Sequence, residues 1–341
     1  MPRKFDVPAL VEGVRAGSRS HVAQAITLVE SRLPAHRPLA RQLLTELASV
    51  DTKTVRVGIS GVPGAGKSTF INSMGQLLIE KGHRVAVLAV DPSSSRTGGS
   101  VLGDRTRMGE LTQHPDAFVR PSPSGNHLGG VARATREAML VVEAAGFDVV
   151  IVETVGVGQS EVAVSGMVDT FLMLALSRSG DQLQGIKRGI LEITDVIAVN
   201  KADGDNAGEA RVAARELSIA MKLVTQQSGD RRVPVLTCSA LQRIGLEEVW
   251  QAVVEHRDWL DETIGLENHR AQQQVVWMHS QIEATLLDSM RSNEQLRNLR
   301  DRLEDDVRHG RTSAIEASGD FLREFATQVP QMDWAQGKNV L

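Results

Sequence analysis

The stretch that decides the fold of this chain is VGISGVPGAGKST, residues 57–69. The part from Gly61 to Ser68 fits the pattern G-x-x-x-x-G-K-[ST] of a phosphate-binding loop. That pattern carries information only between a buried strand and a helix. Residues 55–59 alternate as a short buried strand, and residues 68–80 have the composition of a helix. We therefore predict a strand–loop–helix unit that binds a nucleoside triphosphate.

The residue types in this loop suit a phosphate group. Glycines let successive backbone N–H groups turn toward a phosphate, and the helix that follows adds its dipole. Lys67 would bring a positive charge to the β- and γ-phosphates, and Ser68 would bring a hydroxyl to Mg²⁺. The alternative is a glycine-rich turn that binds nothing. Because every motif position is filled and both flanks are correct, we favour the phosphate loop.

Composition limits the classes of function. The chain has 341 residues, enough for one large domain and smaller appendages. A net charge of −4, the absence of tyrosine and an aromatic content of 3% argue against nucleic-acid binding. No apolar run reaches the roughly 20 residues that span a membrane. Cys238 is the only cysteine, so no intrachain disulfide can form. We expect a cytoplasmic protein with no nucleic-acid or membrane partner.

The pattern of hydrophobic residues divides the chain into three regions. Residues 1–50 have helical spacing, residues 51–262 alternate strands with helices, and residues 263–341 are helical again. Alternating strands and helices predict an α/β fold with a mostly parallel, doubly wound sheet. The expected strands are 56–60, 85–90, 118–120, 149–153, 170–176, 196–200 and 233–237, and the expected helices between them are 69–80, 128–145, 183–193, 207–221 and 246–260.

Acidic residues follow two of the expected strands. Asp91 comes directly after the strand at 85–90, Asp104 lies in the same loop, and Glu153 ends the strand at 149–153. Ligands of such sheets bind beyond the carboxyl ends of the strands, and carboxylate oxygens are ligands that Mg²⁺ prefers. These side chains are therefore candidates for holding Mg²⁺ or its bound waters. A solvated surface loop without a role is the alternative for residues 91–105.

The tetrapeptide Asn200-Lys201-Ala202-Asp203 follows another strand and fits the pattern N-K-x-D. The Asp203 carboxylate can accept hydrogen bonds from both N1–H and the amino group of guanine, which adenine cannot donate. Asn200 would join this loop to the phosphate loop, and the Lys201 stem would stack on the base. An isolated tetrapeptide is a weak signal. Downstream of a phosphate loop it predicts guanine recognition.

The last expected strand ends at Thr237-Cys238-Ser239-Ala240. Backbone N–H groups of Ser239 and Ala240 could face the guanine carbonyl. Cys238 has no histidine near it in the sequence, so we interpret it as a packing residue rather than a nucleophile.

Together these strand ends resemble a G protein, and four segments narrow the resemblance. They are similar to the MeaB/MMAA family, also called ArgK-type, of GTPase chaperones for adenosylcobalamin-dependent acyl-CoA mutases, typically methylmalonyl-CoA mutase. The segments are DPSSSRTGGS at 91–100, GDRTRM at 103–108, ETVGVGQ at 153–159 and LQGIKRG at 183–189. The resemblance covers roughly residues 20–330.

The resemblance implies a role for individual residues. The phosphates would be bound by Gly61, Val62, Pro63, Gly64, Ala65, Gly66, Lys67, Ser68 and Thr69. The Mg²⁺ environment would consist of Ser68, Asp91, Asp104 and Glu153, and guanine would be recognised by Asn200, Lys201, Asp203, Ser239 and Ala240. The implied catalytic residues are Lys67, Glu153 and Lys187.

Residues 179–188 resemble an additional switch that senses the partner enzyme. Lys187 there would stabilise charge in the transition state when the mutase is docked. The sequence without the resemblance favours a solvated lysine at a helix start. The chain has Asp181-Gln182 where the family usually has two acidic residues.

The region after residue 262 carries a long apolar stripe at helical spacing, from Val275 to Met290 and on to Leu303. Packing against the parent domain and a subunit interface both explain such a stripe. The resemblance implies the second, a homodimer formed through C-terminal helical arms.

The implied activity is GTP hydrolysis, slow alone and stimulated by the mutase, which gates cofactor loading and protects or reactivates that enzyme. Cobalamin would be reached only through the partner enzyme. Two other functions remain open. A GTP-dependent P-loop kinase would act on a transport protein or a small molecule, and a metallochaperone GTPase would need His/Cys clusters, whereas the nine histidines are scattered.

Overall fold

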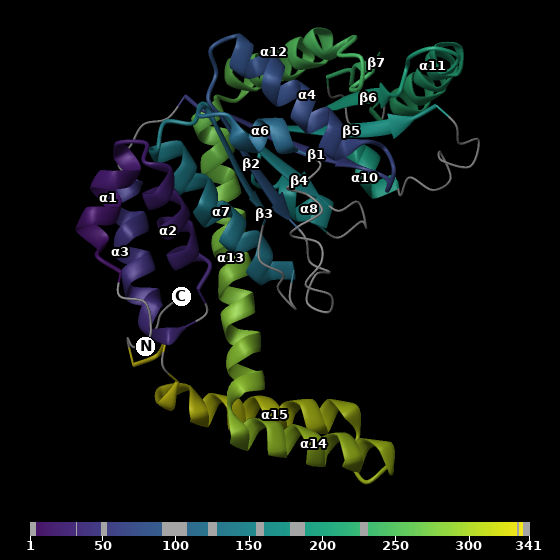
Figure 1. Cartoon of the computed structure of the whole chain (residues 1–341). Coiled ribbons are helices and arrows are strands. Elements are labelled where there is room, and N and C mark those ends of the chain that lie inside the picture. Colours follow the sequence, from purple (N-terminus) through teal and green to yellow (C-terminus); the bar gives the residue numbers. More distant parts are fainter. Residues whose placement is uncertain are drawn as a thin grey trace. The chain divides into compact units, whose positions relative to one another are not determined.

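The computed structural model describes residues 5–31, 33–48, 53–90, 108–121, 128–154, 160–177, 188–225, 231–332 and 334–336 (Figure 1). The chain forms two compact units. Unit 1 consists of Met1–Ser31 and Leu39–Gln273, and unit 2 of Arg32–Pro38 and Gln274–Leu341. Among the described residues, no helix combines the length and the apolar character needed to cross a membrane.

Unit 1 is built around a seven-stranded sheet in the order β3-β2-β4-β1-β5-β6-β7. Every neighbouring pair is parallel. The central strands β2, β4 and β5 are mostly apolar and are buried along almost their whole length, as expected of strands that helices cover on both faces. The strands are β1 (Val55–Gly61), β2 (Val85–Val90), β3 (Ala117–Pro121), β4 (Val149–Thr154), β5 (Thr170–Leu176), β6 (Val196–Asn200) and β7 (Val235–Thr237).

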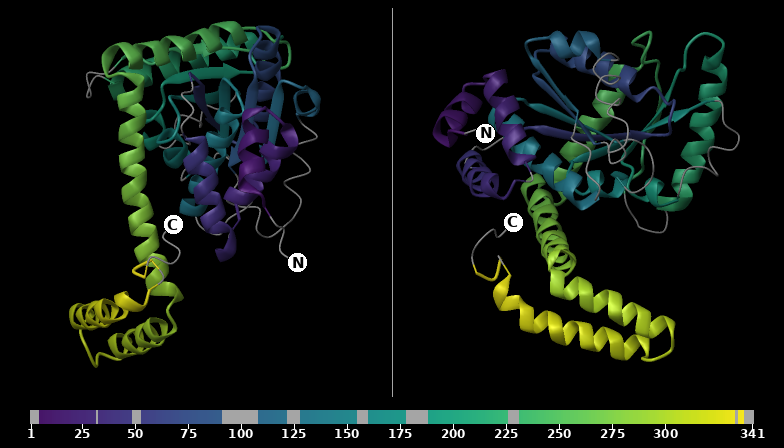
Figure 2. Two further views of the ribbon diagram at one scale, coloured as in Figure 1. Left: turned by 90° about the vertical axis from the view of Figure 1, so that its left-hand side faces the viewer. Right: turned by 60° about the horizontal axis from the view of Figure 1, so that its bottom comes forward.

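Helices cover both faces of this sheet, as Figure 2 shows from two further directions. One face packs against α4 (Lys67–Glu80), α6 (Gly109–Gln113) and α12 (Leu246–Thr263). The other packs against α7 (Leu128–Ala144) and α8 (Ser160–Ser165), and α10 (Arg188–Glu192) and α11 (Asn206–Thr225) lie beside β5 and β6. The order of the strands places β1, which leads into the phosphate loop, in the middle.

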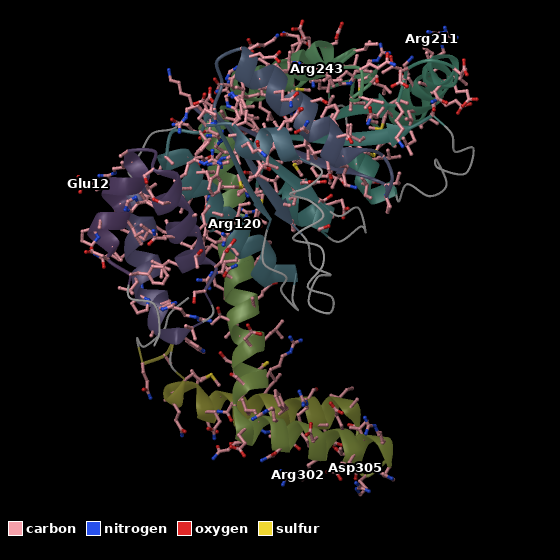
Figure 3. All side chains as sticks on the ribbon, viewed as in Figure 1. Glu12, Arg120, Arg211, Arg243, Arg302 and Asp305 are labelled. Atoms are coloured by element: carbon pink, nitrogen blue, oxygen red, sulfur yellow. The ribbon has the colours of Figure 1, made fainter. Side chains whose placement is uncertain are left out.

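Three N-terminal helices share the hydrophobic core of the second face. They are α1 (Val7–Arg15), α2 (Arg19–Val29) and α3 (Arg37–Leu47), with the short 3-10 helix η1 (Pro34–His36) between the last two. Asp6 caps α1 by accepting a hydrogen bond from the backbone N–H of Ala9 at 3.2 Å. Arg120, labelled in Figure 3, reaches from β3 to the carboxylate of Glu30. These helices are thus joined to the sheet by apolar packing and by an ion pair.

The amino ends of β1 and β5 each lie beside a buried ion pair. Arg270, on the helix α13 (Leu266–Ser292), donates two hydrogen bonds to Asp169, and its guanidinium also donates to the carbonyl oxygen of Thr54. Buried charges require such partners, because an unpaired one would lose its hydration without compensation. The two pairs are Arg56–Glu143 at 2.6 Å and Arg270–Asp169 at 2.7 Å. His256 lies 3.3 Å from Asp195 before β6, but burial lowers the pKa of His256 to about 4, so its imidazole is neutral at pH 7 and the contact is not an ion pair.

Three helices account for most of unit 2. α13 (Leu266–Ser292) begins in unit 1, and α14 (Glu294–Arg308) and α15 (Ala314–Gln328) form an antiparallel hairpin (Figure 2). Asn293 caps α14, and Ser313 with Glu316 forms a capping box at the start of α15. The 3-10 helix η3 (Val329–Gln331) follows. Arg302 and Asp305 mark the charged outer side of α14 in Figure 3.

The α/β fold predicted from the sequence is confirmed. All seven strands occur where the hydrophobic pattern places them, and β2, β5 and β6 have the predicted bounds. The helices α6 and α8 were not predicted, because five or six residues are too few to show helical periodicity. The division into regions 1–50, 51–262 and 263–341 stays a prediction.

Candidate nucleotide-binding site

The phosphate loop connects β1 to α4 in a tight turn. Gly66 has φ 87°, a left-handed conformation that favours glycine, and a Cβ there would lie 2.8 Å from Nδ2 of Asn200. The N–H of Ala65 donates to the carbonyl oxygen of Val62 at 3.0 Å, which closes the turn. The absence of a side chain at position 66 therefore lets Asn200 approach the phosphate loop. Asn200 begins the segment 200–203, which is predicted to bind guanine and is called the guanine loop.

Lys67 and Ser68 open α4 at the carboxyl edge of the sheet. The ammonium of Lys67 donates to the carbonyl oxygen of Gly61 at 2.7 Å, which holds the positive charge over the loop. The Ser68 hydroxyl faces Oε1 of Glu153 at 3.5 Å. Glu153 is the penultimate residue of β4, and it lies beside Ile59 of β1 in the parallel ladder. The lysine and the two oxygen-bearing side chains thus converge on one end of β1.

The pair Ser68–Glu153 fits a magnesium ion. A hydroxyl and a carboxylate are both hard oxygen donors, and Glu153 is 8% exposed, so its charge lies in a poorly solvated position next to the loop. The other expected ligands, Asp91 and Asp104, lie outside the described residues, as does Lys187. For these three residues the roles stay predictions.

The guanine loop follows β6 and is joined directly to the phosphate loop. Nδ2 of Asn200 donates to the carbonyl oxygen of Ala65 at 2.9 Å, while its Oδ1 accepts from the N–H of Ala240 at 3.0 Å. Lys201 has φ 61°, a backbone conformation that is uncommon outside glycine and turns the chain sharply after the strand. Asn200 is 1% exposed, so its side chain serves this connection and does not reach solvent.

Asp203 and Ser239, both predicted to recognise guanine, are joined by a hydrogen bond. The Ser239 hydroxyl donates to the Asp203 carboxylate and also accepts from the N–H of Gln242 at 3.1 Å. The Ser239 N–H donates to the carbonyl oxygen of Ile244 at 2.9 Å. The sequence predicted that the N–H groups of Ser239 and Ala240 could face the guanine carbonyl. The N–H of Ser239 is instead bonded within its own loop. The other, on Ala240, is bonded to Asn200, so a guanine carbonyl would have to share it.

Two residues near the guanine loop have no functional role predicted from the sequence. Ser73, on the buried side of α4, donates from its hydroxyl to the carbonyl oxygen of Ala240 at 2.7 Å. Cys238 is 1% exposed with its Sγ 3.8 Å from Oδ1 of Asn200, and burial raises its pKa to about 12. A thiol that stays protonated at neutral pH packs the loop and is a poor nucleophile. A serine within a helix carries no sequence signal that could have identified Ser73.

Comparison with known proteins gives one consistent result. The family model for the methylmalonyl Co-A mutase-associated GTPase MeaB matches residues 22–295. The probable GTPase Rv1496 of Mycobacterium tuberculosis is 53% identical over 316 residues, covering 93% of this chain and 94% of that protein. The GTPase ArgK of Escherichia coli is 48% identical over 284 residues, covering 83% and 86%.

A solved structure agrees over nearly the whole chain. The crystal structure of an LAO/AO transport system kinase is 37% identical, covers 95% of this chain and 99% of its own, and superposes with a TM-score of 0.76. The extent of the family match and the identities confirm the resemblance that the motifs at the strand ends indicated. The chain belongs to the MeaB family of methylmalonyl-CoA mutase-associated GTPases and is itself a GTPase.

Proposed function

We propose that this protein is a GTP-binding and GTP-hydrolysing chaperone that gates cofactor loading of an adenosylcobalamin-dependent mutase, most directly methylmalonyl-CoA mutase. It would also protect or reactivate that enzyme. The observation that carries the proposal is the match of the mutase-associated family model over residues 22–295. The connection of the phosphate loop to the guanine loop through Asn200 supports it, because guanine recognition and phosphate binding then act together.

In the proposed reaction, water attacks the γ-phosphate and GDP leaves. Lys67 and the backbone N–H groups of the phosphate loop neutralise the charge that develops on the phosphate oxygens. Ser68 and Glu153 would hold Mg²⁺ together with Asp91 and Asp104, and the ion would supply further charge neutralisation when bound. We identify no strong general base among the described residues. This fits a slow enzyme that a partner accelerates.

Lys187 is the residue that we propose to complete the site when the mutase docks. The test is GTP turnover with and without an adenosylcobalamin-dependent mutase. Stimulation of the parent protein and its loss in Lys187→Ala, with the basal rate unchanged, would support the proposal. Equal rates with and without every such mutase would contradict the chaperone function and leave the GTPase activity standing.

Guanine recognition has its own test at Asp203. In Asp203→Asn the carboxylate that accepts two hydrogen bonds from guanine becomes an amide, which can donate to the C2 carbonyl of xanthine. We expect affinity for GTP to fall at least a hundredfold and affinity for XTP to rise. Unchanged GTP binding would show that Asp203 does not contact the base.

The homodimer, the cytoplasmic location and the absence of direct cobalamin contact belong to the same proposal. Six large apolar side chains of α13 remain between 36% and 54% exposed in the single chain, which supports a partner for this helix. They are Val275, Val276, Met278, Ile282, Leu286 and Leu287.

A GTP-dependent kinase is the second candidate, because the 37% identical solved structure is that of a transport system kinase. Kinase activity requires an acceptor that receives the γ-phosphate. Incubation with γ-labelled GTP and candidate acceptors separates the two functions, because label on an acceptor indicates a kinase and label in inorganic phosphate indicates a GTPase.

A further inference from the structure

Glu161, the second residue of α8, is a fully buried carboxylate whose described donors are all hydroxyl groups. Its Oε1 accepts from Ser60 at 3.3 Å and lies 3.4 Å from the Thr154 hydroxyl, and its Oε2 accepts from Ser160 at 3.2 Å. Burial of a carboxylate is costly because the charge loses its hydration, and hydrogen bonds from hydroxyl groups offset only part of that cost. A role other than stability would explain why a carboxylate occupies this position.

The cluster lies where the backbone ladder between β1 and β4 ends. The last partners in that ladder are Ile59 and Glu153. At the next position on each strand the two chains are joined by side chains instead, because the Thr154 hydroxyl donates to the Ser60 hydroxyl at 2.8 Å. Glu161 accepts from this bridge and extends it to the start of α8. Side-chain hydrogen bonds thus connect β1 and β4 at the position where the backbone ladder between them has ended.

The two residues at the end of β4 point to opposite faces of the sheet, as successive residues of a strand do. Glu153 points toward Ser68 on α4, and Thr154 points toward Glu161 on α8. Ser60 directly precedes Gly61, where the phosphate loop begins. Glu161 therefore acts on the ends of both strands from the face opposite to the nucleotide.

We infer that Glu161 is a positioning residue that fixes the end of β4, and with it the Glu153 carboxylate, relative to the phosphate loop. The inference rests on the proposed role of Ser68 and Glu153 in holding Mg²⁺. Partners behind a metal ligand typically contribute 10- to 100-fold to metal affinity, because they set the direction of the ligand.

The test replaces Glu161 by glutamine in the full chain. Glutamine has nearly the same size, but it turns one acceptor into a donor that faces hydroxyl groups. The measurement is binding of GDP labelled with an N-methylanthraniloyl fluorophore, titrated with Mg²⁺ and repeated in EDTA. We expect Glu161→Gln to need about tenfold more Mg²⁺ for half-maximal tight binding, with its affinity in EDTA unchanged.

Glu143→Gln is the matched control. Glu143 is also a buried glutamate bonded to β1, but it pairs with Arg56 at the other end of the strand. The Glu143→Gln variant should melt at a lower temperature than the parent protein and have the same Mg²⁺ midpoint. An unchanged midpoint in Glu161→Gln, or an equal shift in Glu143→Gln, overturns the role of Glu161. Parent protein whose binding does not respond to Mg²⁺ overturns the metal site itself and the inference with it.

A second pair of variants decides the question if Glu161→Gln fails to fold. Thr154→Val removes the hydroxyl bridge and keeps the shape, whereas Thr154→Ser keeps the hydroxyl. The inference requires a raised Mg²⁺ midpoint in Thr154→Val and a midpoint close to that of the parent in Thr154→Ser. Equal midpoints in these two variants contradict it.

Discussion

The hydroxyl of Ser73 donates to the carbonyl oxygen of Ala240 at 2.7 Å, which joins the helix after the phosphate loop to the guanine loop. The N–H of the same Ala240 donates to Asn200, and Asn200 donates in turn to Ala65 in the phosphate loop. These hydrogen bonds form a closed ring through α4, the phosphate loop and both base-recognition segments. The segments predicted to bind the base are thus tied to Ser73, a residue outside both predicted binding motifs.

Ser73→Ala is therefore expected to weaken base discrimination. The change leaves the buried carbonyl of Ala240 without this donor, at a cost of about 1–3 kcal/mol to the loop. We expect the preference for GTP over ITP, which lacks the amino group that Asp203 would accept, to fall about fivefold to tenfold. The ratio of the dissociation constants for GTP and ITP, measured at equilibrium, gives this preference. The control is Thr45→Ala, which removes a hydroxyl on α3 that donates to the backbone carbonyl oxygen of Arg41. An unchanged ratio in Ser73→Ala would separate Ser73 from base recognition.

The pair Asp195–His256 predicts opposite pH responses for its two single variants. Burial raises the pKa of Asp195 to about 7 and lowers the pKa of His256 to about 4. The groups that face the pair are Thr170, Trp259, Arg231, His269 and Asp169. Between pH 4 and 6.5 the folded protein holds a proton on Asp195 and the unfolded chain holds one on His256. The two contributions cancel, so the pair adds little pH dependence to the parent protein.

Removal of one member exposes the contribution of the other. In Asp195→Asn only His256 remains, so the free energy of unfolding should fall as pH drops from 6.5 toward 4. In His256→Gln only Asp195 remains, and the free energy of unfolding should fall as pH rises from 4 toward 7. The slope is at most about 1.4 kcal/mol per pH unit, and less where water reaches the 32% of the Asp195 side chain that stays exposed. Urea unfolding at several pH values measures both, and slopes of the same sign would refute the assignment.

Asp169→Asn should be among the most destabilising polar substitutions in unit 1. Its side chain is fully buried, accepts two hydrogen bonds from Arg270 and accepts a third from the N–H of Arg56 at 2.9 Å. Loss of the charge leaves the guanidinium buried without its counterion, which costs about 3–5 kcal/mol. Glu80→Gln breaks the exposed pair with Arg243 and should change the stability little. Similar melting temperatures for the two variants would contradict this difference.

Ile282→Glu tests the proposed dimer. Ile282 is 47% exposed and lies in the middle of the apolar stripe of α13, so a charge there would be buried unpaired in a two-chain interface. We expect light scattering after gel filtration to show a dimer for the parent protein and a monomer for the variant, with unchanged melting of the sheet unit. Gln295→Glu, at an exposed position of α14 outside this stripe, provides a charge control. A monomeric parent protein would contradict the dimer directly.

The sequence predicted those parts of the molecule whose signal is local. Strands such as β5 are continuous apolar runs, and the residues at positions 61–68 and 200–203 form short motifs at strand ends. Contacts between distant positions could not be predicted in the same way. Ser73 meets Ala240, and Asp195 meets His256, only because the sheet brings their segments together. Glu161 lies in a helix too short to show a period, and its partners are ordinary serines and threonines.

The two buried ion pairs at the amino ends of β1 and β5 have a practical consequence. The nucleotide-binding motifs occupy the opposite, carboxyl edge, so the two edges of one sheet carry separate tasks. Redesign of the amino edge, for example by an apolar replacement of the whole Arg56–Glu143 pair, whose described side-chain hydrogen bonds join only these two residues, should keep or raise heat resistance and leave the chemistry at the far edge alone. The stability of the sheet can thus be engineered at its amino edge independently of the nucleotide-binding residues at its carboxyl edge.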